Sequence, residues 1–79
     1  MKLILAVLRR VMQRVKITYN FNQLKGKPKR IVESTEGCTI KSYGVNKDSV
    51  TLIFLTYTDE ALETVLSLLR QSGVTDIKY

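Results

Sequence analysis

The hydrophobic period of this chain changes at Val15, and this change restricts the folds that the chain can adopt. Before it, apolar residues recur every three or four positions, which is typical of an amphipathic helix. From Val15 to Asn22, apolar and polar residues alternate, which is the pattern of a half-buried strand. We therefore expect a leading amphipathic helix over residues 1–14 and one domain over residues 15–79.

The leading segment contains a short apolar run followed by arginines. The run from Leu3 to Leu8 is far below the roughly twenty residues that a membrane-spanning helix needs. No small-residue cleavage site follows it, which argues against a signal peptide. Arg9 and Arg10 come directly after the run, as cations do at the cytoplasmic end of a membrane span. A helix packed on its own domain is the alternative interpretation.

The next segments predict a helix and a hairpin. Pro28 suits the first turn of a helix, so residues 28–37 predict a short helix that ends at Gly37. A strand is the alternative there, because β-branched and hydroxyl residues form helices poorly. Residues 38–43 and 50–57 predict two strands, joined by a turn that contains glycine, asparagine and aspartate.

The carboxy-terminal segment predicts a second helix and a last strand. Residues 58–73 have a helical apolar stripe, with Thr58 as a candidate N-cap and Gly73 as the stop signal. Residues 74–79 then predict a strand. The expected order after the leading helix is β–α–β–β–α–β.

This order predicts an α+β fold of the ferredoxin-like or ACT-like type, a βαββαβ sandwich in which two helices cover one face of a four-stranded antiparallel sheet. The strand over residues 50–57 is apolar on both sides. The open face of the sheet therefore needs a cover, and the candidates are the leading helix, a second copy of the domain or a ligand.

Positive charge is concentrated in the first part of the chain. Residues 1–30 hold nine basic residues and no acidic residue, whereas residues 31–79 hold four basic and seven acidic residues. Such an asymmetry indicates that one end of the molecule meets an anionic surface, and nucleic acid and phospholipid are the usual ones.

The residue composition argues against catalysis and against transition metals. The chain has no histidine and one cysteine, so soft and imidazole ligands for zinc or copper are missing and no cofactor is expected. No histidine can activate Cys38, which we interpret as a small apolar residue of a strand. The sequence specifies no nucleophile–base or acid–base pair, so we predict that the protein is not an enzyme.

The nucleic-acid alternative is the weaker one. RNA-recognition modules carry stacking aromatics within a glycine-containing signature on a central strand, and the corresponding segment SVTLIFLTY lacks both glycine and a leading base. A stacking platform built from the tyrosines is a minor interpretation; these are Tyr19, Tyr43, Tyr57 and Tyr79.

Three segments together carry a resemblance to a known family. They are LILAVLRRVMQRVKITYNF, CTIKSYGV and EALETVLSLLRQSGVTDIKY, and they resemble the carboxy-terminal end of the MgtC/SapB family of bacterial inner-membrane proteins. The resemblance is one of pattern, with no residue-specific motif. It implies a cytoplasmic domain related to the ACT fold, behind a membrane-exit helix. It also implies a regulatory role in a protein linked to magnesium homeostasis.

We therefore predict a non-catalytic regulatory or interaction domain at the cytoplasmic face of a bacterial membrane protein. Its partners are an anionic lipid surface or the transmembrane part of the parent protein, and a second copy that binds through the sheet. The alternatives are a stand-alone ACT-like small-molecule sensor and a small basic nucleic-acid-binding domain. The candidate membrane contacts are Arg9, Arg10, Arg14 and Lys16, and the candidate phosphate-contacting loop contains Lys25, Lys27, Lys29 and Arg30.

Overall fold

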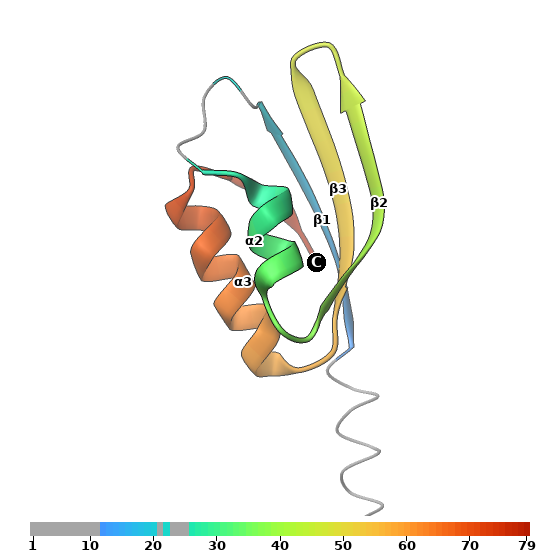
Figure 1. The fold of residues 1–79 in the computed structure, drawn as a ribbon, viewed down its shortest axis with the longest axis vertical. Helices are drawn as coiled ribbons and strands as arrows, with labels where there is room; N and C mark the ends of the chain where they lie inside the picture. Colours follow the sequence, from blue (N-terminus) through green and yellow to red (C-terminus); the bar gives the residue numbers. More distant parts are fainter. Residues whose placement is uncertain (1–11, 21, 23–25) are drawn as a thin grey trace, which may run out of the picture.

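The protein has an α+β architecture in which two helices pack on a four-stranded antiparallel sheet (Figure 1). The computed structural model describes residues 12–20, 22 and 26–79. In chain order the elements are β1 (Gln13–Asn20), α2 (Pro28–Ser34), β2 (Cys38–Asn46), β3 (Ser49–Thr56), α3 (Asp59–Gln71) and β4 (Asp76–Lys78). The strands lie in the order β2-β3-β1-β4, which is consistent with a small ferredoxin-like fold.

The first strand begins earlier than the sequence predicts. Gln13 and Arg14 already pair with β3, opposite Thr56 and Leu55. Strand β1 therefore includes Gln13 and Arg14, the last two residues of the predicted leading helix. Cross-strand pairing outweighs the helical spacing of the apolar side chains at this point. Met12 is in neither a helix nor a strand, and residues 1–11 of the predicted leading helix lie outside the described residues.

Helix α2 settles the choice between helix and strand over residues 28–37. Pro28 occupies its first turn, where a missing N–H costs nothing. The helix ends at Ser34 and not near Gly37, because Thr35 already has an extended backbone. Gly37 instead has φ +85° in the connection to β2. A Cβ atom there would lie 2.9 Å from the Cβ of Ala61, so glycine is also required by space.

The hairpin and helix α3 form largely as predicted. Strands β2 and β3 are joined by a turn of only two residues, so β2 continues through part of the predicted loop. Thr58 caps α3, since its Oγ1 accepts a hydrogen bond of 3.0 Å from the N–H of Ala61. Gly73 follows the helix with φ +107°, as a stop signal requires.

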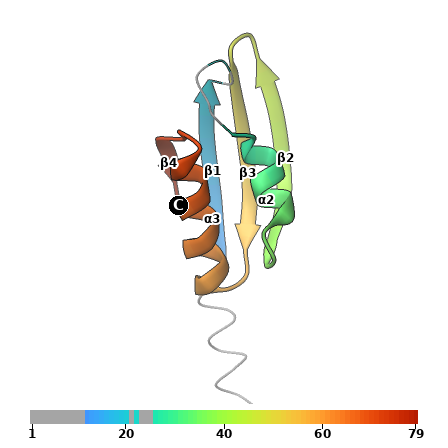
Figure 2. The same cartoon turned by 60° about the vertical axis from the view of Figure 1, so that its left-hand side comes forward.

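The hydrophobic core lies between the two helices and one face of the sheet (Figure 2). Alternate residues of β1 and β3 point into it, and α3 contributes one apolar stripe. Its largest fully buried side chains are Phe54, Ile17, Leu52, Leu69, Val15, Val32, Val65 and Val74. No described helix is long and apolar enough to cross a membrane. The opposite face of the sheet is covered by no other described element.

Candidate anion-contacting sheet face

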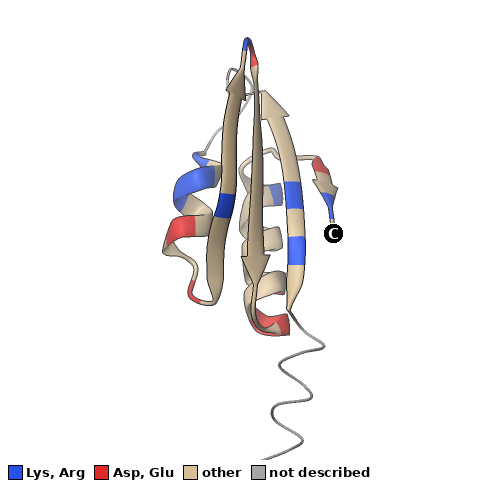
Figure 3. Ribbon diagram, turned by 90° about the vertical axis from the view of Figure 1, so that its right-hand side faces the viewer, with Lys and Arg blue, Asp and Glu red and all other residues tan. Residues whose placement is uncertain are grey.

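The face of the sheet opposite the helices, here called the open face, carries a group of basic residues. Arg14 and Lys16 lie two positions apart on β1, and their buried neighbours Val15 and Ile17 point to the helices. Because side chains alternate along a strand, both cations project from the open face. Figure 3 views the sheet from this side and shows basic segments on β1, β2 and β4.

Two lysines stand directly opposite each other on this face. Lys16 of β1 and Lys78 of β4 are partners in the antiparallel ladder. Like charges in this position repel and lower stability, typically by 0.2–1 kcal/mol. The acidic residue of β4, Asp76, is paired with Thr18 instead. The strand pairing therefore concentrates positive charge that an external anion can neutralise.

A fourth cation lies at an irregularity of the edge strand. The register between β2 and β3 shifts between Ile40 and Ser42, so Lys41 is an extra residue of β2 without a ladder partner, next to Ser42, which pairs with Ile53. Since Ile53 is also the partner of Lys16, one row of paired residues crosses the sheet through Lys16 and Lys78, and Lys41 lies next to the end of this row on β2.

Two aliphatic side chains occupy the centre of the open face. Ile53 and Leu55 of β3 are half-buried. They are the ladder partners of Lys16 and Arg14. The face thus combines a small apolar centre with a basic surround. This combination suits a partner that has both anionic and apolar groups.

The strand aromatics lie on the other side of the sheet. Tyr19 and Phe54 point into the core, and Tyr43 pairs with the core residue Leu52 on the same side. Burial raises the pKa of Tyr19, and the nearby Tyr43 adds to the effect. Tyr57, which directly follows β3, is exposed, so within the described strands themselves the aromatic side chains lie on the helix side and the central strands present none for base stacking on the open face.

The predicted basic residues are divided by the fold. Arg14 and Lys16 come together on the open face, although Arg14 lies on a strand and not on the predicted helix. Lys27, Lys29 and Arg30 are exposed at the start of α2, on the helix side of the sheet. The residues outside the described part are Arg9, Arg10 and Lys25.

The predicted phosphate-contacting loop has a different local role in its described part. The Nζ of Lys29 lies 4.6 Å from the centre of the Tyr43 ring, which is a cation–π contact. Lys27 precedes α2 without a side-chain cap. Nothing in this arrangement joins these residues to the basic group on the open face.

Sequence reasoning missed Lys41 and Lys78 as members of the basic group. Both occur far from the amino-terminal cluster and appear isolated in the sequence. The signal was available in the predicted antiparallel order, because β4 pairs with β1 in this topology. The alternation around Ile77 then puts Lys78 on the open face.

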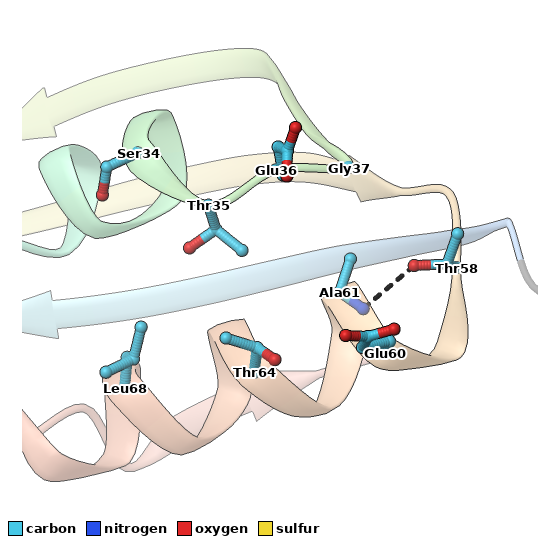
Figure 4. Close-up of a pocket in the computed structure, with 9 residues that line it drawn as sticks. All are labelled: Ser34, Thr35, Glu36, Gly37, Thr58, Glu60, Ala61, Thr64 and Leu68. Carbon is cyan, nitrogen blue, oxygen red and sulfur yellow. Dashed lines mark hydrogen bonds between the residues drawn. The ribbon is translucent and has the colours of Figure 1, made fainter.

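A hollow lies on the helix side between α2, Gly37 and α3 (Figure 4). Its hydroxyl groups are largely committed to local structure. Ser34 and Thr35 donate to the carbonyl of Ile31, and Thr58 accepts from Ala61. Among the described residues no cluster of three or more histidine, cysteine, aspartate or glutamate side chains could hold a metal ion.

Cys38 packs beside the core as a partly buried residue. Burial raises the pKa of its thiol above the ordinary value, which lowers the thiolate fraction at neutral pH. This environment supports its interpretation as a small apolar residue.

Comparison of the chain with protein families, with curated proteins and with solved structures gives no match.

Proposed function

We propose that this protein is a non-catalytic interaction domain that lays the open face of its sheet against an anionic membrane surface. The observation that carries the proposal is the pair of cations Lys16 and Lys78 in one row of the sheet, with Lys41 next to the end of that row and Arg14 in the next row of the face. The MgtC/SapB resemblance implies a regulatory domain that follows a bacterial inner-membrane segment. In this proposal, the membrane lies against the open face of that domain.

The chain order supports this placement. The apolar run from Leu3 to Leu8 and the pair Arg9 and Arg10 precede β1 by only a few residues. A lipid contact made by that run would hold the start of β1 close to the headgroups. Arg14 is the first cation that the strand presents there.

Lipid is favoured over nucleic acid by the side chains of the open face. Single-stranded nucleic acids are bound mainly by aromatic stacking and by a basic groove. Here the centre of the face is the aliphatic pair Ile53 and Leu55. Aliphatic groups surrounded by cations match the boundary between acyl chains and phosphates.

The expected strength follows from the number of cations. Each basic residue near an anionic membrane contributes about 1 kcal/mol. Removing Arg14 and Lys16 therefore costs about 2 kcal/mol, or about a 30-fold loss in partition coefficient. The control is the removal of Lys27 and Arg30. It lowers the net charge by the same amount as the removal of Arg14 and Lys16, but on the helix side of the sheet.

The test is sedimentation of the full chain with vesicles of phosphatidylcholine, with and without phosphatidylglycerol. We expect binding to the anionic vesicles only, lost in the double variant R14Q/K16Q and retained in K27Q/R30Q. Equal losses in the two variants would show unspecific attraction to net charge and refute the proposal. Tighter binding to a single-stranded oligonucleotide than to anionic vesicles would favour the nucleic-acid alternative.

A further inference from the structure

Strand β2 forms one edge of the sheet, and its outer half carries exposed apolar side chains. Val45 is 62% exposed and Tyr43 is 44% exposed. Figures 1 and 2 show the tip of the hairpin extending beyond the amino-terminal end of α2. An edge strand with apolar side chains and free backbone groups is a template for pairing with another strand.

The hairpin turn determines which backbone groups of β2 are free. A two-residue turn closes on a pair that exchanges both hydrogen bonds, here Asn46 and Ser49. Alternate residues of β2 then direct their N–H and C=O groups to β3, beginning with Asn46 and Gly44. The groups of Tyr43 and Val45 point to the free edge.

We propose that β2 pairs antiparallel with β2 of a second copy of this chain over residues 42–46, with Gly44 on the two-fold axis. In this register Tyr43 of each copy stands opposite Val45 of the other. Each such pair can exchange two backbone hydrogen bonds, because both residues direct these groups outward. The two four-stranded sheets become one continuous sheet.

The side chains select this register. Residues directly opposite each other in an antiparallel pair project from the same face. Tyr43 and Val45 share the helix side, because their partners Leu52 and Val50 are core residues. Pairing about Gly44 therefore forms two aromatic–aliphatic contacts. A shift by one residue would place Tyr43 opposite a residue of the open face.

The irregularity at Lys41 limits the pairing and favours a second copy over a longer extended peptide. Beyond Ser42 the extra residue changes which side chains face the helices, so a regular strand cannot continue the ladder. The remaining segment of five residues is short, and its own sequence supplies an apolar residue opposite both Tyr43 and Val45 when two copies pair about Gly44. Gly44 has nothing within 4 Å of its Cβ position, so two copies can approach closely there.

Disulfide cross-linking tests the register directly. Gly44 would stand opposite itself in a pair without hydrogen bonds, with Cα atoms about 4.5 Å apart, within the range that a disulfide spans. The variant C38A/G44C should form a covalent dimer with oxidised glutathione. The control C38A/N46C should form at least fivefold less covalent dimer. In the proposed register Asn46 stands opposite Ser42 of the other copy, so the two new cysteines are far apart. Equal cross-linking of the two variants would overturn the proposal.

Sedimentation equilibrium tests whether the chain self-associates through edge strand β2, without introducing a new cysteine. Proline at position 45 removes an outward N–H, and edge strands tolerate proline in such a position. We expect V45P to weaken self-association at least tenfold, and L68K, at an exposed leucine of α3, to leave it unchanged. V45K serves the same purpose if circular dichroism shows that V45P is unfolded. A wild-type chain that stays monomeric at 1 mM would refute the proposal.

This proposal does not depend on lipid binding, and all of its measurements are made without vesicles. Lipid binding can therefore be absent while the dimer forms, and the dimer can be absent while lipid binding is observed.

Discussion

Thr56 is buried, its hydroxyl has no hydrogen-bond partner among the described residues, and replacing it with valine should stabilise the protein. The residue ends β3 on the helix side of the sheet, between Gln13 on β1 and Cys38 on β2. It is 0% exposed, and its Oγ1 has no partner among the described residues. Valine has nearly the same shape and no polar atom, so the T56V variant removes the hydroxyl and leaves the packing almost unchanged.

The size of the effect follows from the cost of an unpaired polar group. A buried donor or acceptor without a partner costs about 1–3 kcal/mol. The exchange to valine should recover about 1–2 kcal/mol of this in the free energy of unfolding. For a domain of this size, 1 kcal/mol corresponds to a rise in melting temperature of about 4–8 °C.

Urea unfolding followed by circular dichroism measures this change. We expect a higher midpoint with an unchanged slope, since the surface exposed on unfolding stays the same. Thr51→Val is the matched control, because Thr51 lies on the same strand but is only half-buried on the open face. The free energy of unfolding of the Thr51→Val variant should differ from that of the wild type by less than about 0.5 kcal/mol. A T56V variant that is less stable than the wild type would refute the reasoning, because its hydroxyl would then have a partner.

Three further predictions concern other features of the fold. Lys78→Glu should raise the free energy of unfolding by up to about 1 kcal/mol, because it replaces the repulsion with Lys16 by attraction, and should also weaken binding to anionic vesicles. Gly37→Ala should lower the melting temperature by several degrees, because φ is +85° and the new Cβ would clash with Ala61; a neutral effect would contradict this reasoning. Burial raises the pKa of the Cys38 thiol above its ordinary value, so the unfolded chain loses its thiol proton first as the pH rises. Thermal unfolding should therefore show full stability below about pH 8 and a greater loss by pH 10 in the wild type than in C38A.

Much of the fold could be predicted because local signals and tertiary packing agree. Thr58 is a strong N-cap next to a regular apolar stripe, and α3 begins there. Pro28 similarly outweighed the poor helix formers that follow it. At Gln13 and Arg14 the two kinds of information disagree. Their helical spacing is local, whereas their pairing with β3 involves residues about forty positions away.

The candidate site was only partly predictable for the same reason. Arg14 and Lys16 are two positions apart in the sequence, so their grouping can be recognised from the sequence alone. Lys78 joins them through the register of β1 and β4, which depends on how two distant strands align. The irregularity at Lys41 carries no sequence signal of its own, and a regular strand would have turned the side chains after it to the opposite face.

The two proposed surfaces reinforce each other because of the symmetry of edge pairing. A two-fold axis through Gly44 and perpendicular to the sheet keeps both open faces on one side. Each copy presents Arg14, Lys16, Lys41 and Lys78 against the single acid Asp76, which at about 1 kcal/mol per charge gives about 3 kcal/mol of attraction to an anionic membrane. One copy is thus held weakly, whereas a dimer engages twice the charge without new contacts. Vesicle binding should therefore rise more steeply than linearly with protein concentration in the wild type and linearly in V45P.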